Sequence, residues 1–292
     1  LPTTVFLFSS FTYDAFVIAL LMLGIALFVT EYLSEEKIQT KRTMVSILAI
    51  VVGCFSKAVY IPFLALYWLM PKDKFYSRRQ KNLFKAGIFV LLILMFASFI
   101  LPLIGNVTSG AEVGDYRGGD TSQTSQLSMI LGYPLTYTGV LLKSLGTTFA
   151  SYFIGSKVLA NFAYRGIYDG IGYFVVLLTM LFTFVTDFGM TEKIYDAQMK
   201  RKILMMKIWN AVLIFGTACL VWTALYLDFT PVGSMVINGV SPRYYLPLIF
   251  PLSLIFINQK VRCSMKLENY QSLIAFLMLI GTGISIYCLM LA

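Results

Sequence analysis

Long segments without charged side chains limit the possible folds of this sequence more than any other feature. Six windows of 15 to 22 residues hold at most one charged residue each: 15–33, 86–104, 170–186, 208–227, 244–258 and 270–291. A helix of about 20 apolar residues crosses the hydrocarbon core of a bilayer. Only 13% of the chain is charged, whereas soluble domains have about 25%. We therefore predict an all-α fold, a polytopic transmembrane helical bundle with six full spans. Pro247 and Pro251 should kink the fifth.

Lysines and arginines cluster between these windows. Seventeen of the 23 lie in four segments, 34–43, 71–85, 187–207 and 259–269. Cytoplasmic loops of membrane proteins are enriched in both residue types. We therefore predict that all four segments are cytoplasmic, in a multi-pass protein of the cytoplasmic membrane. The net charge of +9 is then a signal of orientation. Membrane lipid is the expected partner, and no nucleic acid is needed to explain the charge.

The segment 44–70 must enter and leave the membrane on one side if all four basic segments share that side. Twelve apolar-rich residues precede Ser56 and Lys57, and thirteen follow them. Two half-length helices of about 18 to 20 Å each, joined at Ser56 and Lys57, meet this requirement. The alternative is one long span over 44–70, which puts six basic residues outside. The hairpin agrees better with the charge distribution.

Lys57 is the lone charge in this apolar segment. A cation at membrane depth is costly, so it is by default a hypothesis for a functional site. In the alternative interpretation, the lysine extends from the turn toward lipid phosphates. Asp14 precedes the first window, where a carboxylate also suits a helix N-terminus. Arg243 precedes the fifth, where it either binds a phosphate with its planar guanidinium or anchors the interface beside Tyr244.

The segment 105–168 is the one long polar excursion. It begins with a loop rich in Gly, Ser and Thr, and after Pro134 the residues Leu135, Thr138, Leu142, Leu145, Phe149 and Tyr152 share one helical face. We predict an outer loop followed by an amphipathic helix at the outer interface; the alternative is a further span. The acidic group at 112–120 is a possible divalent-metal site or a solvated loop. We predict no cofactor.

Several kinds of chemistry have no support in the sequence. There is no histidine, so imidazole catalysis and histidine-ligated metals are absent from this chain. Cys54, Cys219 and Cys288 fall in predicted membrane segments and Cys263 in a predicted cytoplasmic segment, so no disulfide framework is expected. The chain begins with Leu1-Pro2 and no basic flank, and we expect it to be a fragment of one transmembrane domain whose N-terminal part is missing.

Three motifs together resemble a known family. The runs Ser10-Phe11-Thr12-Tyr13-Asp14-Ala15, Ser56-Lys57-Ala58-Val59-Tyr60-Ile61-Pro62 and Gly239-Val240-Ser241-Pro242-Arg243-Tyr244-Tyr245-Leu246-Pro247 are similar in order and spacing to the bacterial membrane family called domain of unknown function 2142 (DUF2142). The departure is Ser241-Pro242, where the family usually has Gln-Gly, and the arginine is kept.

The resemblance implies an architecture similar to the C-class (GT-C) glycosyltransferases of the bacterial inner membrane. These enzymes transfer a sugar from a polyprenyl-phosphate carrier to a glycan or lipid acceptor on the outer face. Such a site needs cations for the donor phosphate. Lys57 and Arg243 are the candidates for phosphate binding, and Asp14, Tyr60 and Tyr244 for lining the cavity. The catalytic residues are unknown, because the acidic loop of the class has no counterpart in this sequence.

Two other functions stay open. A transporter or flippase of lipid-linked glycans also uses intramembrane charges and broken helices, although no inverted internal repeat is visible. A non-catalytic scaffold for the envelope-polysaccharide machinery is the third possibility. We predict that Asp14, Lys57 and Arg243 converge on one outward-open cavity.

Overall fold

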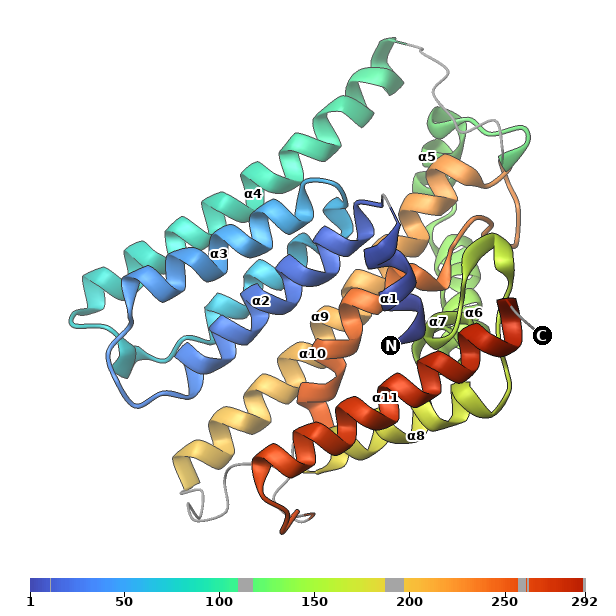
Figure 1. The fold of residues 1–292 in the computed structure, drawn as a ribbon. Helices are drawn as coiled ribbons and strands as arrows, with labels where there is room; N and C mark the ends of the chain where they lie inside the picture. The colour runs from blue at the N-terminus through green and yellow to red at the C-terminus, as the bar shows by residue number, and fades with distance from the viewer. Residues whose placement is uncertain (11, 110–117, 187–196, 257–260, 262, 291–292) are drawn as a thin grey trace.

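The computed structural model describes residues 1–10, 12–109, 118–186, 197–256, 261 and 263–290, and all regular structure in them is helical (Figure 1). One isolated bridge joins Asn161 and Ile167. The predicted all-α class is confirmed. The acidic group considered as a metal site lies mostly in 110–117, outside the described residues.

Four helices are long and apolar enough to cross a membrane: α2 (Asp14–Leu33), α4 (Arg78–Ser109), α9 (Ala197–Phe229) and α11 (Leu267–Met290). The first three contain one predicted window each, and α11 covers residues 270–290 of the window 270–291. The windows 170–186 and 244–258 gave the shorter helices α8 (Ile171–Val185) and α10 (Leu246–Phe256), with Pro251 inside α10. At 1.5 Å per residue these helices are roughly 22 and 16 Å long, so the predicted count of six full spans is not confirmed.

The hairpin predicted for 44–70 is present. Its arms are α3 (Thr40–Cys54) and the 3₁₀ helix η1 (Ala58–Leu69). The hairpin returns to the end of the bundle at which it starts. The Ile38 amide, before α3, donates a hydrogen bond of 2.9 Å to the Lys74 carbonyl, after η1. The 15 residues of α3 span about 22 Å, and the 12 of η1, at roughly 2.0 Å each, about 24 Å. The arms are therefore longer than predicted.

The 3₁₀ helix η1 lies at the centre of the bundle, in contact with α2, α3, α4 and α9. Most of its apolar side chains are buried, Ile61, Phe63 and Leu64 completely, whereas Trp68 is 37% exposed. So long a 3₁₀ helix is unusual, and side chains of neighbouring helices bind its carbonyl groups. The Trp209 indole donates to the Ala65 carbonyl and the Lys85 ammonium to the Trp68 carbonyl, both at 2.9 Å. Tertiary contacts thus support the backbone of this arm.

Close contact with α2 fixes the other arm. Gly24 faces α3, where an added Cβ would lie 2.5 Å from Ile50 Cγ1, and the Ser46 hydroxyl donates to the Gly24 carbonyl at 2.5 Å. The Tyr67 hydroxyl of η1 donates in turn to Ser46 Oγ. A glycine and a serine therefore hold α2 and both arms together.

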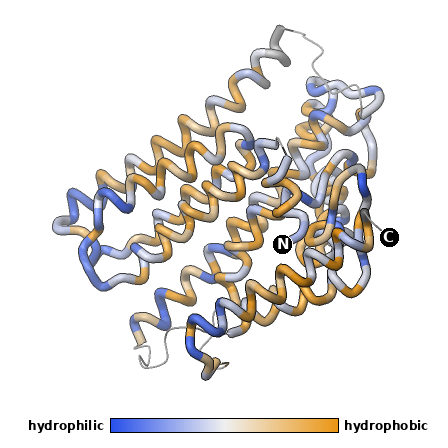
Figure 2. The backbone as a smooth tube through the Cα atoms, in the orientation of Figure 1, coloured by the Kyte–Doolittle hydropathy of each residue, from blue (hydrophilic) through white to orange (hydrophobic). Residues whose placement is uncertain are grey.

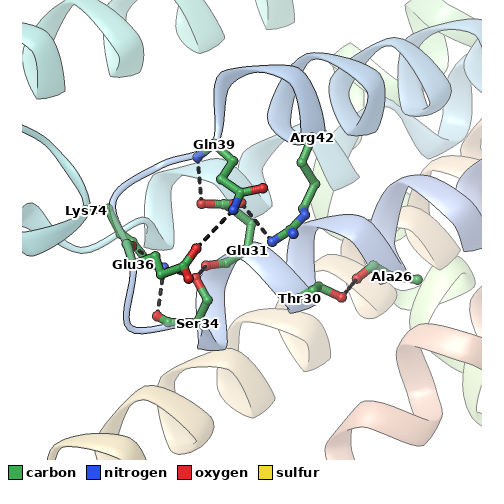
Figure 3. A network of polar contacts seen from close by, with 8 residues as sticks. All are labelled: Ala26, Thr30, Glu31, Ser34, Glu36, Gln39, Arg42 and Lys74. Atoms are coloured by element: carbon green, nitrogen blue, oxygen red, sulfur yellow. Dashed lines mark hydrogen bonds and ion pairs between the residues drawn. The ribbon is translucent and has the colours of Figure 1, made fainter.

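The loops 34–39 and 71–77 lie with the first turns of α9 at one end of the bundle, here called the basic end (Figure 2). A polar network ties the two loops to each other and to the ends of α2 and α3 (Figure 3). Buried Glu31 accepts from the Gln39 amide at 3.0 Å and forms an ion pair with Arg42 at 3.4 Å. Lys74 donates to the carbonyls of Ser34 and Glu36. These contacts place the basic segments 34–43 and 71–85 at one end of the bundle; which side of the membrane that end faces stays a prediction.

The remaining elements lie mostly toward the opposite end. They are α1 (Pro2–Ser9), α5 (Gln123–Gly132), α6 (Pro134–Phe153), α7 (Ser156–Leu159), η4 (Ala163–Arg165) and η5 (Pro242–Tyr245), whereas η2 (Lys72–Lys74) lies at the basic end. The helix predicted after Pro134 is present as α6. Leu135 and Phe149 of its predicted apolar face are 87% and 61% exposed, and α6 packs Tyr137, Val140 and Phe153 inward, against elements that include α9 and η5. A position of the exposed face at the membrane interface stays a prediction.

Candidate functional site

Three charged side chains from distant parts of the chain meet at the end of α2 away from the basic loops. Asp14 is the first residue of α2, Lys57 precedes η1, and Arg243 lies in η5. The Lys57 ammonium donates a hydrogen bond to Asp14 Oδ1, and Arg243 Nε lies 3.5 Å from Asp14 Oδ2. The predicted convergence is confirmed. An outward-open cavity at this place stays a prediction.

Tyrosine rings surround the two cations. The Lys57 ammonium lies 4.0 Å from the ring centroid of Tyr244 and 5.2 Å from that of Tyr13. The guanidinium carbon of Arg243 lies 5.7 Å from the Tyr244 centroid. Such contacts stabilise a cation through the negative face of the ring. Sequence reasoning missed Tyr13, although it directly precedes Asp14.

Tyr60 has a different place from the one predicted. Its side chain is completely buried, and its hydroxyl donates to the Tyr244 carbonyl at 2.6 Å. It therefore cannot line an open cavity. It supports the backbone that carries Tyr244 and the neighbouring arginine.

The three charged side chains differ in how deeply they are buried. The side chains of Asp14 and Lys57 are 6% and 11% exposed, and that of Arg243 is 41% exposed. Asp14 is the acidic residue in the first turn of α2, so its carboxylate also suits the helix N-terminus. The interpretation in which Lys57 reaches lipid phosphates is disfavoured, because its ammonium is held inside the protein.

Aromatic side chains of α6 and α9 position η5. The Trp222 indole donates to the Tyr245 hydroxyl at 2.6 Å, and the Tyr152 hydroxyl donates to the Val240 carbonyl at 3.0 Å. Gly239 has a φ of +78°, and an added Cβ would collide with the ring of Phe229. Sequence reasoning missed these supports, since a tryptophan in a spanning helix gives no sign of its partner.

The cluster, meaning Asp14, Lys57 and Arg243 with the rings of Tyr13 and Tyr244, carries two cations against one carboxylate. An excess positive charge in a partly buried site is costly unless an anion or water approaches it. Among the described residues there is no group of three or more acidic or cysteine side chains that could hold a metal ion. The excess positive charge of the cluster favours the binding of an anion.

A family model described as "Predicted membrane protein (DUF2142)" matches residues 1–252. The chain belongs to this family. The match includes every residue of the cluster and ends within α10, so α11 lies beyond it. No curated protein and no solved structure matches the chain. Membership in a membrane family agrees with the apolar helices and with lipid as a partner, and the DUF2142 description names no reaction.

Proposed function

We propose that this DUF2142 protein binds the phosphate of a polyprenyl-phosphate-linked sugar and acts in glycosyl transfer during synthesis of a cell-envelope polysaccharide. The observation that carries the proposal is the excess positive charge of the cluster at the end of the bundle away from the basic loops. If the basic end is cytoplasmic, as the charge distribution predicts, the cluster faces the outer side of the bacterial inner membrane.

The chemistry of a lipid-linked donor suits this place. Its phosphate lies at the membrane surface while its tail stays among lipid chains. Arg243 offers a planar guanidinium that matches phosphate oxygens, and Lys57 adds a second positive charge. Phe16 and Phe55, near Asp14 and Lys57 in sequence, are 71% and 63% exposed and give apolar surface for the tail.

The catalytic base is not part of the proposal. In a GT-C-like architecture the donor phosphate is the leaving group, and cations stabilise the charge that develops on it. Within this chain the cluster would take that role, with a glycan or lipid as acceptor. Transport of a lipid-linked glycan is the second candidate. The observation that favours it is the irregular arm η1, with Pro62 inside a 3₁₀ helix beside the cluster, since transporters often use broken helices.

Binding to the full-length protein in detergent tests the first step, with decaprenyl monophosphate and the uncharged alcohol decaprenol as paired probes. We expect the phosphate to bind at least about tenfold more tightly than the alcohol. Lys57→Met and Arg243→Gln should remove that preference, whereas Lys72→Met, at an exposed lysine of the basic end, should keep it. Equal binding of both probes by the wild-type protein would contradict the proposal.

Cells then separate the two candidate functions. For a glycosyltransferase, the full-length Lys57→Met protein should lack one sugar of the envelope glycan and accumulate the unused lipid-linked donor on the outer face. For a transporter, the lipid-linked glycan should accumulate on the inner face. An unchanged glycan would remove the cluster from either function.

A further inference from the structure

We propose that the two cations of the cluster have different roles: Arg243 contacts the phosphate directly, and Lys57 is a positioning residue that neutralises Asp14 and so leaves Arg243 available. This inference rests on the proposed phosphate binding and concerns how the same site works. The resemblance to DUF2142 implied the same role for both cations.

Lys57 has little room for a ligand. Its ammonium donates to Asp14 Oδ1 and faces the rings of Tyr244 and Tyr13. A carboxylate and two ring faces thus surround a group whose side chain is only 11% exposed. A phosphate oxygen therefore has much less access to this nitrogen than to the guanidinium of Arg243.

Arg243 is in the opposite situation. Its side chain is 41% exposed, and its only ion-pair contact among the described residues is the 3.5 Å approach of Nε to Asp14 Oδ2. That approach does not meet hydrogen-bond geometry, and the buried Nε has no hydrogen-bond partner there. A guanidinium carries five N–H donors in a fixed plane, so its terminal nitrogens can bind two oxygens of one phosphate.

Asp14 decides how much of the positive charge of Arg243 a ligand meets. Paired with Lys57, the carboxylate is neutralised, and the arginine keeps a weak contact with it. Without Lys57, Arg243 alone would compensate the negative charge of the carboxylate. The carboxylate would then repel an incoming phosphate. Lys57 therefore acts on the ligand through Asp14.

Two double variants of equal net charge test this division. Asp14→Asn with Lys57→Met leaves Arg243 as the one cation, and Asp14→Asn with Arg243→Gln leaves Lys57. Both clusters keep the wild-type net charge of one positive unit. We expect the first to recover decaprenyl monophosphate binding to within about threefold of wild type, and the second to stay at least about tenfold weaker. The single variant Lys57→Met should be weak, so the recovery is the specific sign of a positioning role.

The measurements are equilibrium binding to the full chain in one detergent, together with the melting temperature of each variant, so that only folded proteins are compared. If a double variant does not fold, phenylglyoxal modification of the wild-type protein gives a second measurement. Decaprenyl monophosphate should protect Arg243 from the reagent, while decaprenol should not.

Each outcome decides between the proposals. Failure of the wild-type protein to bind the phosphate refutes the proposed function and this inference with it. Binding by the wild type, with recovery only in the double variant that keeps Lys57, overturns the inference alone. Equal recovery in both double variants means that net charge alone matters and overturns it as well. An unprotected Arg243 in a protein that binds the phosphate contradicts a direct contact.

Discussion

Replacing Asp14 with asparagine should destabilise the protein and tighten its binding of phosphate. The substitution keeps the size and an oxygen acceptor for Lys57 but removes the one negative charge of the cluster. In the wild-type protein Lys57 and Arg243 share the Asp14 carboxylate. In the variant the two cations would repel each other with no negative charge between them. Reduced stability and increased affinity rarely follow from one substitution, so the combination tests the electrostatic reasoning directly.

The loss of stability follows from burial. Removing one partner of a buried ion pair costs about 3 to 5 kcal/mol, because the other charge stays buried without compensation. Lys57 is 11% exposed and meets this condition, whereas Arg243, 41% exposed, is partly solvated and loses little. We take the low end, about 3 kcal/mol. At about 2 °C per kcal/mol in a chain of this size, the melting temperature should fall by roughly 6 °C.

The gain in affinity follows from distance. Arg243 Nε lies 3.5 Å from Asp14, and a phosphate hydrogen-bonded to the guanidinium adds about 3 Å. Two unit charges about 6.5 Å apart repel by about 2.5 kcal/mol at an effective dielectric constant of 20, and by about 1.3 kcal/mol at 40. Removing the carboxylate should therefore tighten phosphate binding by about 10- to 70-fold.

Both quantities can be measured on one sample. The tryptophans Trp68, Trp209 and Trp222 lie in η1 and α9, so their fluorescence reports thermal unfolding in detergent. Decaprenyl monophosphate titrations give the affinity. Asp73→Asn is the matched control, because that aspartate pairs with a lysine at the basic end and is 49% exposed. An Asp14→Asn protein that melts within about 1 °C of wild type and binds phosphate no more tightly would refute the reasoning.

Three further predictions concern topology and packing. Single cysteines at Ser77 and Ser122 in a cysteine-free protein should be labelled from opposite sides of the membrane; labelling of both from outside would rule out a cytoplasmic basic end. Gly24→Ala should lower the melting temperature, because the new Cβ would lie 2.5 Å from a side chain of α3, whereas Gly87→Ala, with no atom within 4 Å, should not lower it. Trp222→Phe removes the hydrogen bond to the η5 tyrosine and should cost about 1 to 3 kcal/mol in a thermal-unfolding measurement.

The sequence predicts the long helices and the hairpin for physical reasons. Hydrocarbon imposes a length on uncharged segments, so four of the six windows became helices of spanning length. The hairpin followed from counting basic residues. The 3₁₀ form of η1 could not be predicted, because its carbonyl groups depend on Trp209 and Lys85, which are distant in sequence.

The charged residues of the cluster could be predicted from the sequence, but the aromatic residues that position them could not. A lone cation in an apolar segment needs a partner, and few candidates exist in so weakly charged a chain. That reasoning led to Asp14 and Arg243. It could not show that Tyr60 supports Tyr244 from behind, or that Trp222 positions η5, because aromatic residues are frequent and their contacts depend on packing.

Matching segment lengths explain why Asp14 meets Lys57. At the basic end, α2 and α3 are joined through Glu31, which binds the Gln39 amide and Arg42. From Glu31, α2 leads over about 26 Å to Asp14, and the 15 residues of α3 lead over about 22 Å to its last residue. The three residues of the turn, 55–57, can extend this by as much as about 10 Å, so Lys57 reaches the level of the Asp14 carboxylate. The polar network at one end therefore sets the register of the charges at the other.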